Sequence, residues 1–332
     1  MVRVGFIGLG GMGLYQTKAF AQVKGCRIVA GADVESSSRE KFLALYPDAK
    51  TFDNHKNLLA DPGVDAVVIA VPTGYHRATA SDALKIGKPV LLEKPMARTV
   101  ADCRRLNELA ARTDTLLMIA QCRRYDAHWG SWGQYVTDGM LGGPVLWRSV
   151  MAGFGPGRWF MDDQLGGGPL LDGAIHNYDF AQLIFGDPES VVSSAIKMDT
   201  GVTAVDTCSA VVRYRSGHQL LMSWSWSARG LSMSDVIGPK GFIQFGTGDL
   251  TPSEKDKQRY AFCCFTDAAG KQSLLKAKSE PGMYVRQAEH FLDCVQGKAE
   301  CRTPGTEAIK AVAVAEAILI AGRAGKAMPV KW

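Results

Sequence analysis

A carboxylate and an imidazole stand four residues apart just after a run of three glycines. Asp172 and His176 follow Gly166–Gly168, in a stretch with a helical pattern that runs to about Phe185. Residues four apart lie on one face of a helix. Asp172 would then orient the ring of His176 while the ring exchanges a proton with a substrate hydroxyl. A half-buried histidine that bonds to its own helix neighbour would give the same pattern.

A lysine follows directly after a short apolar run. Val90–Leu92 is succeeded by Glu93, Lys94 and Pro95. Open parallel sheets bind their ligands beyond the carboxyl ends of the strands. The ammonium group of Lys94 should therefore project into that crevice, with Pro95 fixing the chain direction just beyond it. The alternative is a lysine that ends a strand and extends its charge into water.

A glycine motif ends the first apolar run of the chain. Gly8, Gly10 and Gly13 form a G-x-G-x-x-G that opens directly into a helical stretch. Dinucleotide binding needs glycine here because the backbone must turn tightly, expose its N–H groups to a pyrophosphate and bring helix close to strand. A glycine-rich turn without a ligand is the other interpretation of the motif alone.

An acidic residue in the next apolar run strengthens the case for a dinucleotide. Asp33 lies twenty residues after Gly13, where the ribose hydroxyls of a bound dinucleotide are expected. A carboxylate accepts hydrogen bonds from both hydroxyls and repels a 2′-phosphate, which favours NAD over NADP. The residues Ser36–Ser38 and Arg39 follow closely and could instead hold that phosphate.

Strand and helix patterns alternate over the first 120 or so residues. Apolar runs too short for helices predict buried strands at 2–7, 28–30, 67–71, 90–92 and 116–119. A helix is expected over Thr99–Arg112, where Thr99 and Asp102 form a start of the capping-box type. Such alternation predicts a doubly wound parallel sheet with helices on both faces.

Beyond about Cys122 the pattern changes to strands in which apolar and polar residues alternate. One expected strand carries Cys208, Ala210, Val212 and Tyr214 on one face, and the next, after the turn at Ser216–Gly217, carries Met222, Trp224 and Trp226. The tryptophan face could stack on sugar rings. Two tryptophans at a spacing of two residues more often pack in a core or a subunit interface, which we expect here. Helices are expected over 281–295 and 306–321.

Composition excludes several classes of protein. The 332 residues are 46% hydrophobic and carry a net charge of +5 that is spread along the chain, which argues against disorder, nucleic-acid binding and attachment to a membrane surface. No apolar run approaches the roughly 20 residues that span a bilayer, and the first residues lack a signal-peptide pattern. The eight cysteines show no metal-ligand spacing. We expect a cytoplasmic protein with reduced thiols and no metal site.

Six motifs together resemble the Gfo/Idh/MocA family of oxidoreductases, in the family's order and across nearly the whole chain. They are Gly8-x-Gly10-x-x-Gly13, Pro72-Thr73-x-x-His76, Glu93-Lys94-Pro95, Arg124-Tyr125-Asp126, Gly166-Gly167-Gly168 and Asp172-x-x-x-His176. The resemblance implies a Rossmann domain over 1–122. It implies a substrate-binding and oligomerisation domain over 123–332, with a large, mostly antiparallel open sheet, and nicotinamide-dependent chemistry on sugars or cyclic polyols.

The resemblance also implies roles for individual residues. Lys94 would touch the reacting hydroxyl, His176 would be the acid/base and Asp172 would support both. The expected cofactor-binding residues are Gly8, Gly10, Gly11, Met12, Gly13, Asp33, Pro72, Thr73, His76, Glu93, Lys94 and Arg124. The expected substrate-binding residues are Lys94, Tyr125, Arg158, Trp159, Asp172, His176 and Asn177.

Three residues depart from the usual family pattern. Ala127 stands where a proline is common, Tyr125 replaces the commoner phenylalanine, and Asn177 replaces a frequent aspartate. The amide of Asn177 would suit neutral hydroxyls better than a cationic substrate. These departures concern the shape of the substrate rather than the class of reaction.

The resulting hypothesis is an NAD(P)-dependent dehydrogenase that acts on a secondary hydroxyl of a sugar, a cyclitol or a sugar derivative. An NAD-dependent glycosidase, which oxidises its substrate transiently and is redox-neutral overall, would use the same residues. A nucleotide-binding sensor without catalytic activity is a third interpretation. The predicted proton-transfer group argues against it, because a sensor does not need one. A homo-oligomer, dimer or tetramer, is expected from the family's open sheet.

Overall fold

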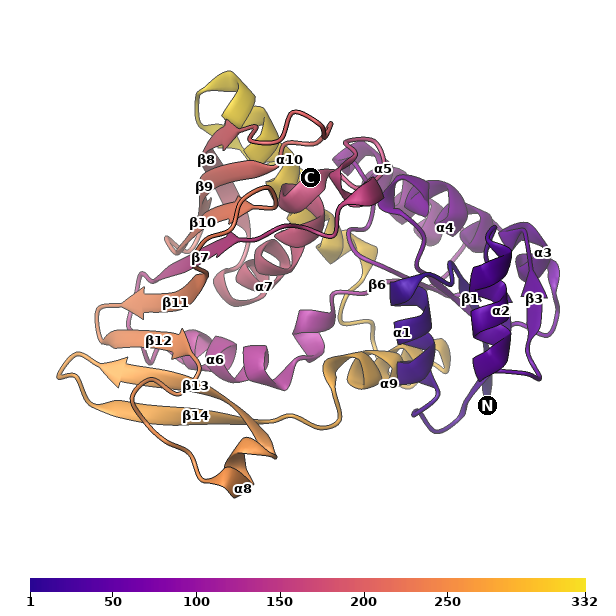
Figure 1. The fold of residues 1–332 in the computed structure, drawn as a ribbon, viewed down its shortest axis with the longest axis horizontal. Helices are drawn as coiled ribbons and strands as arrows, with labels where there is room; N and C mark the ends of the chain where they lie inside the picture. Colours follow the sequence, from indigo (N-terminus) through magenta and orange to yellow (C-terminus); the bar gives the residue numbers. More distant parts are fainter. The chain divides into compact units, whose positions relative to one another are not determined.

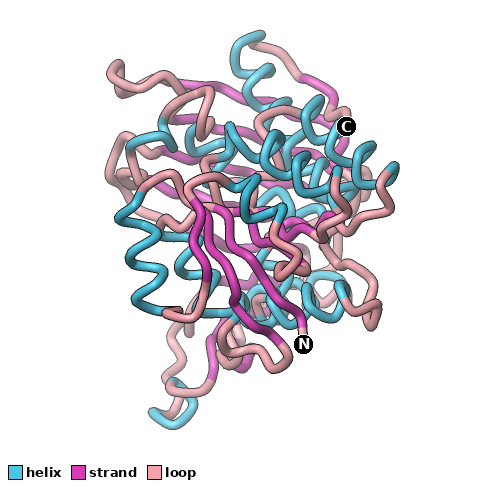
Figure 2. Tube along the Cα trace, turned by 90° about the vertical axis from the view of Figure 1, so that its right-hand side faces the viewer, coloured by secondary structure: helices cyan, strands magenta, loops and turns pink.

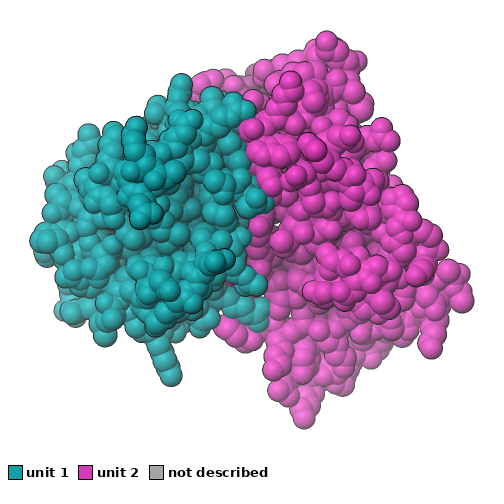
Figure 3. All heavy atoms as spheres, turned by 180° about the vertical axis from the view of Figure 1, so that it is seen from behind, with its two compact units in different colours: residues 1–122, 284–309 teal, residues 123–283, 310–332 magenta. Residues whose placement is uncertain are grey.

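The computed structural model describes residues 1–332, apart from the side chain of Arg158. The chain forms two compact units, shown in teal and magenta in Figure 3. The first unit comprises Met1–Cys122 and Tyr284–Ile309, and the second comprises Arg123–Met283 and Lys310–Trp332. A late segment of the sequence therefore folds with the first unit. The functional division into 1–122 and 123–332 stays a prediction.

The first unit contains a six-stranded sheet in the order β3-β2-β1-β4-β5-β6, and all of its strand pairs are parallel. Its strands, drawn in magenta near the N-terminus in Figure 2, are β1 (Val2–Ile7), β2 (Cys26–Ala32), β3 (Lys50–Phe52), β4 (Ala66–Ile69), β5 (Val90–Leu92) and β6 (Leu117–Ile119). The five strands expected from apolar runs are confirmed. No apolar run predicts β3, because this three-residue strand at the sheet edge begins with a lysine and a threonine.

Six helices lie mainly in the first unit. They are α1 (Gly11–Phe20), α2 (Ser36–Leu45), α3 (His55–Ala60), α4 (His76–Lys85), α5 (Val100–Arg112) and α9 (Met283–Val295), labelled in Figure 1. The predicted cap of α5 is confirmed, because the Thr99 hydroxyl accepts the Asp102 N–H at 3.1 Å. Helix α9 packs on α1, where the rings of Phe20 and Phe291 have centroids 6.1 Å apart.

The second unit is built on a nine-stranded sheet in the order β14-β13-β12-β11-β7-β10-β9-β8-β15. Its strands are β7 (Leu146–Ala152), β8 (Pro188–Ile196), β9 (Thr207–Tyr214), β10 (Gln219–Ser225), β11 (Met233–Gly238), β12 (Gly241–Phe245), β13 (Tyr260–Asp267), β14 (Gln272–Lys278) and β15 (Met328–Pro329). Among the described strand pairs of this nine-stranded sheet, only β7 and β10 run parallel. The predicted fold class, a Rossmann sheet followed by a large, mostly antiparallel sheet, is confirmed.

Helices cover one face of this sheet. They are α6 (Ala127–Thr137), α7 (Ile175–Phe185) and the second part of α10 (Gly305–Ala324), while the short α8 (Glu254–Lys257) precedes β13 (Figure 1). An aromatic core lies beneath them, where the ring centroid of Trp132 is 5.0 Å from that of Trp147 and 4.9 Å from that of Phe180. None of the described helices is long and apolar enough to cross a bilayer.

The tryptophan face of β10 points into the core of the second unit. Met222 is fully buried, and Trp224 and Trp226 are each 9% exposed. The Tyr178 hydroxyl of α7 donates to the Met222 sulfur at 3.2 Å. The expectation of a packed face is confirmed, and the packing is within the chain. This face is therefore neither a sugar-stacking surface nor the surface of a subunit interface.

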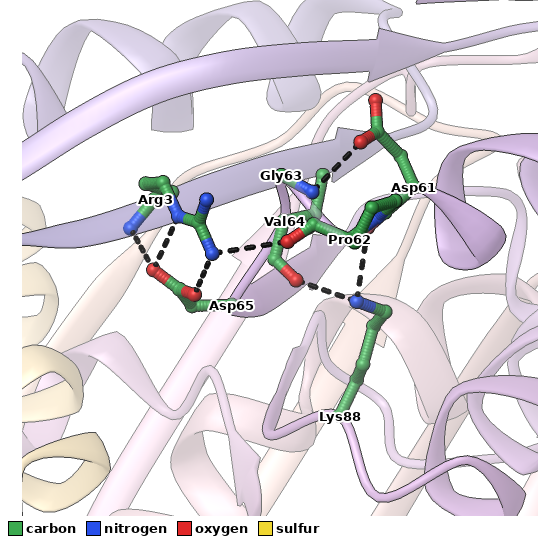
Figure 4. A network of polar contacts seen from close by, with 7 residues as sticks. All are labelled: Arg3, Asp61, Pro62, Gly63, Val64, Asp65 and Lys88. Carbon is green, nitrogen blue, oxygen red and sulfur yellow. Dashed lines mark hydrogen bonds and ion pairs between the residues drawn. The ribbon is translucent and has the colours of Figure 1, made fainter.

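A network of charged and backbone groups ties together the amino ends of β1, β4 and β5 (Figure 4). Arg3 donates to the Asp65 carboxylate at 2.6 Å and to the Pro62 carbonyl at 3.0 Å. Lys88 donates to the Val64 carbonyl at 2.5 Å. The hydrogen bond from Arg3 holds the pKa of Asp65 below its ordinary value. The network thus anchors the sheet at the end opposite to its carboxyl edge.

The lowered pKa of Asp65 predicts acid sensitivity. Because the pKa is lower in the folded chain than in the unfolded one, the ion pair stabilises the fold fully above the unfolded pKa of about 3.9 and less as pH falls through the folded value. Denaturant unfolding between pH 6 and pH 3 should therefore show a steeper loss of stability for the natural chain than for Asp65→Asn. Equal slopes for the two proteins would contradict this account.

Candidate functional site

The glycine motif forms the turn between β1 and α1. Gly8 has a φ of +88°, and a Cβ there would lie 2.5 Å from the Ala70 carbonyl oxygen. A Cβ on Gly13 would collide with the carbonyl oxygen of Gly8. Gly10 and Gly11 instead have no atom within 4 Å of an added Cβ. The outer two glycines thus permit close packing of helix and strand, and the inner two leave their backbone open to a ligand.

The start of α1 is suited to an anion. Gly10 is its N-cap, no side chain caps the first N–H groups, and the first turn contains no acidic residue. The N-terminus of a helix carries a partial positive charge, so these N–H groups can receive a pyrophosphate. Met12, in the same turn, is 39% exposed.

Asp33 lies at the end of β2, beside the glycine turn. Its carboxylate accepts the Leu9 N–H at 2.7 Å and the Glu35 N–H at 2.9 Å. The Arg39 guanidinium donates to the carbonyl oxygens of Asp33 and Val34, at 2.7 and 3.0 Å. The carboxylate is therefore held in place next to the turn, as recognition of a ribose requires, while Arg39 bonds to the backbone of the same loop.

Thr73 supplies a further polar group at the carboxyl edge of the sheet. It follows β4 and Pro72 and is 2% exposed, and its hydroxyl oxygen has no hydrogen-bond partner among the described residues. A buried polar atom without a partner is costly. Together with the open glycine backbone and Asp33, this hydroxyl fits a bound dinucleotide.

His76 braces the two loops that follow β4 and β5. Its ring is 1% exposed, with Nε2 2.9 Å from the Val71 carbonyl oxygen and Nδ1 2.8 Å from the Pro95 carbonyl oxygen. A neutral ring donates from one nitrogen and an imidazolium from both. An imidazolium, or the neutral ring with its hydrogen on Nδ1, donates to the Pro95 carbonyl oxygen and so holds the loop that carries Lys94. Its predicted contact with a cofactor stays a prediction.

Lys94 begins the loop directly after β5, as the sequence predicts. The preceding Glu93 is 6% exposed, and its carboxylate accepts the Lys94 N–H at 3.2 Å and the side-chain amide of Gln16 at 2.6 Å. Gln16 was not among the residues predicted from the sequence. A signal was available, because Gln16 shares the buried stripe of α1 with Gly13, Thr17 and Phe20, and a polar residue at a core-facing position needs a partner.

Asp172 and His176 stand on two different helical turns. Pro169–Gly173 form a π-helical turn and α7 begins at Ile175, so the expected continuous helix over both residues is corrected. The turn starts at Gly168, whose φ of +73° suits glycine. Asp172 is 5% exposed and His176 is half-buried.

A buried ion pair holds α7 against the segment that precedes α6. Arg124 donates from Nε and Nη2 to the two carboxylate oxygens of Asp179, at 2.8 and 2.7 Å. The two side chains are 8% and 1% exposed. Asp179 lies three residues after His176, so the pair fixes the helix that carries the proposed acid/base. Arg124, which the sequence places at the cofactor, is thus also a structural anchor.

The remaining predicted substrate residues have varied surroundings. The Asn177 side-chain amide donates to the Ser149 hydroxyl of β7 at 2.9 Å, so a substrate contact would fall to its second N–H or to its carbonyl oxygen. Tyr125 is 4% exposed. Trp159 stacks on Phe160 with ring centroids 3.7 Å apart. The side chain of Arg158 lies outside the described residues.

Two family models match the chain. One, for an oxidoreductase family with an NAD-binding Rossmann fold, matches residues 2–121, and the other, for the GFO/IDH/MocA C-terminal domain, matches residues 133–244. The chain belongs to the Gfo/Idh/MocA oxidoreductase family. Its first unit is accordingly an NAD-binding Rossmann fold, and the glycine turn, Asp33 and Thr73 provide groups that fit this cofactor.

Relatives of this oxidoreductase cover most or part of its length. The uncharacterized oxidoreductase YdgJ of Escherichia coli (strain K12) is 26% identical over 95% of this chain and 94% of its own. Inositol 2-dehydrogenase 1 of Saccharopolyspora erythraea is 33% identical over 54% of this chain and 52% of its own. The aldose-aldose oxidoreductase of Caulobacter crescentus, solved with glycerol, shares the fold with a TM-score of 0.85 and 24% identity, over 99% of both chains.

The Arg124–Asp179 pair predicts a stability pattern for this oxidoreductase. Asp179→Asn should lower the free energy of unfolding by about 3–5 kcal/mol, because it removes a buried negative charge that pairs with the Arg124 guanidinium. The double variant Arg124→Met/Asp179→Leu should lose less than either single change. The exposed pair of Lys257 and Glu254 offers a control, since Glu254→Gln should change stability by less than about 1 kcal/mol. Similar losses for Asp179→Asn and Glu254→Gln in denaturant unfolding would contradict the assignment.

Proposed function

We propose that this oxidoreductase transfers hydride between NAD and a secondary hydroxyl of a sugar, a cyclitol or a sugar derivative. The observation that carries the proposal is the position of Lys94. It stands at the same carboxyl edge of the six-stranded sheet as the glycine turn, and its loop is held by Glu93 and His76. An ammonium group that is held in place beside a dinucleotide site can stabilise the negative charge that develops on a substrate oxygen.

The proposed chemistry divides among three residues. The nicotinamide, when bound, accepts or returns the hydride. His176 takes the proton from the substrate hydroxyl during oxidation and returns it during reduction. Lys94 stabilises the negative charge that develops on the oxygen, and Asp172 orients the imidazole ring.

The binding roles follow the sequence predictions. For the cofactor we propose Gly8, Gly10, Gly11, Met12, Gly13, Asp33, Pro72, Thr73, His76, Glu93, Lys94 and Arg124. For the substrate we propose Lys94, Tyr125, Arg158, Trp159, Asp172, His176 and Asn177. Relatives named for inositol and aldoses support a neutral polyhydroxylated substrate. All eight cysteines are free thiols, which supports a cytoplasmic location.

The activity is tested by following the absorbance of reduced nicotinamide with NAD and a panel of aldoses, inositols, sugar acids and simple glycosides. We expect multiple turnovers with at least one sugar or polyol. His176→Ala should lower turnover by about 10²–10⁴-fold and leave NAD affinity nearly unchanged, because it removes only the proton acceptor.

His55→Ala is the matched control for this experiment, since His55 pairs with Asp82 between α3 and α4 and belongs to none of the proposed binding sets. Its turnover should equal that of the natural chain. An equal loss of NAD binding in His176→Ala would show that His176 is misplaced in the proposal. Release of an aglycone from a glycoside, without net reduction of NAD, would replace the proposal by a redox-neutral glycosidase.

We further propose that a second copy of this chain covers the outer face of the nine-stranded sheet. None of the described helices lies over the middle of that face, and its apolar residues Val192, Ile196 and Met233 are 52%, 56% and 45% exposed. Burial of such residues favours association.

Sedimentation tests the proposed association. The natural chain should be a dimer or tetramer at micromolar concentration, and Val192→Asp should shift it towards monomer because an unpaired charge would be buried. Glu189→Gln, an exposed change near the start of β8, should leave the oligomer unchanged. A natural chain that sediments only as a monomer would contradict the proposal.

A further inference from the structure

A buried hydrogen bond connects the dinucleotide helix to the lysine loop. Gln16 lies on α1, the helix that begins in the glycine turn, and its side chain is fully buried. Its Nε2 group donates to Glu93 Oε1 at 2.6 Å across a sequence separation of 77 residues. Glu93 immediately precedes Lys94. The bond therefore joins the element suited to a pyrophosphate to the element that carries the proposed catalytic lysine.

The position of the Glu93 carboxylate depends on the groups that donate hydrogen bonds to it. With 6% exposure it receives little hydration, and a buried carboxylate without donors is costly. Gln16 supplies a donor to Oε1, and the Lys94 backbone N–H supplies one to Oε2 at 3.2 Å. Because the two donors hold the two oxygens of one group, the orientation set by Gln16 also sets where the Lys94 backbone can bond.

We propose that Gln16 is a positioning residue for Lys94. It fixes the carboxylate of Glu93, which in turn fixes the backbone from which the Lys94 side chain extends. Gln16 touches neither the reacting atoms nor the cofactor in this scheme. The inference rests on the proposed function, because positioning Lys94 matters only if Lys94 takes part in the reaction. The hydrogen bond would hold the loop after β5 in a constant position relative to α1.

A second buried glutamine provides a matched control. Gln287 on α9 is also fully buried, and α9 packs on α1 through Tyr284 and Tyr15, whose ring centroids are 4.9 Å apart. Unlike Gln16, neither polar atom of its amide has a partner among the described residues. The same substitution at the two positions therefore removes similar volume, and only one of the changes removes a donor to Glu93.

The first measurement needs no substrate. Gln16→Met keeps the length of the side chain and removes the donor. Amide hydrogen exchange at Lys94 should be faster in Gln16→Met than in the natural chain, because the acceptor of that N–H loses the donor that Gln16 supplies. Pro95 has no N–H, so the signal of Lys94 is separated from that of the following residue. Gln287→Met should leave exchange at Lys94 unchanged.

The second measurement separates turnover from binding. Gln16→Met should lower kcat by about 10–100-fold, the size of effect expected when a reacting group is misplaced by about 1 Å. NAD affinity should change less than about threefold, because the glycine turn and Asp33 are intact. Gln287→Met should keep the natural kcat and NAD affinity.

Exchanging donor and acceptor tests the hydrogen bond itself. Gln16→Glu alone places two carboxylates against each other and should lose at least as much turnover as Gln16→Met. Adding Glu93→Gln to that change restores one donor and one acceptor across the contact. The double variant should recover at least about tenfold in kcat over Gln16→Glu, equivalent to about 1.4 kcal/mol.

Lys94→Ala separates failure of the inference from failure of the proposed function. If Lys94→Ala keeps its activity, the role assigned to Lys94 is wrong. If Lys94→Ala loses activity while Gln16→Met keeps both the natural exchange rate and the natural kcat, the positioning role is wrong and the function stands. Equal losses of kcat in Gln16→Met and Gln287→Met would also overturn the inference, because packing alone would then explain them.

Discussion

A buried polar group needs a partner, and the arrangement at the carboxyl edge of the six-stranded sheet depends on meeting this requirement. Strands β4 and β5 are buried throughout, so the loops that leave them begin in surroundings with little water. The His76 ring supplies contacts to two backbone carbonyl groups there. The side chain of Gln16 does the same for a carboxylate. Rigid loops are the result, as a site that transfers a proton and a hydride requires.

The second unit meets the same requirement with a charged pair and an amide. Arg124 and Asp179 neutralise each other where neither is hydrated, and Asn177 bonds to Ser149 of the sheet. Both contacts hold α7, on two of its sides. The helix that carries His176 is thus fixed by polar contacts as well as by the aromatic core beneath it. Such pairs favour one packing arrangement over others, because a shift of the helix would separate a buried charge from its counter-charge.

Local features were predictable from the sequence and long-range partners were not. The strands, the cap of α5 and the glycine turn follow from periodicity and from the steric limits of single residues. Arg124 lies 55 residues from Asp179, and Gln16 lies 77 residues from Glu93. No local sequence pattern indicates contacts over such separations. The π-helical turn at Pro169–Gly173 also escaped prediction, because its residues have the same apolar spacing as an ordinary helix. The edge strand β3 contains one apolar residue, Phe52, which is too few to predict a buried strand.

The packing of α9 on α1 has a consequence for how the protein is made. Phe291, which contacts Phe20, follows it in the chain by 271 residues. During synthesis the apolar side of α1 stays uncovered by α9 while every strand of the nine-stranded sheet except β15 is produced. The nucleotide-binding unit is therefore completed only after most of the other unit has been synthesised, although the larger part of its sequence precedes that unit. A nascent chain of this kind exposes the surface that α9 will cover for as long as the strands β7 to β14 take to be synthesised.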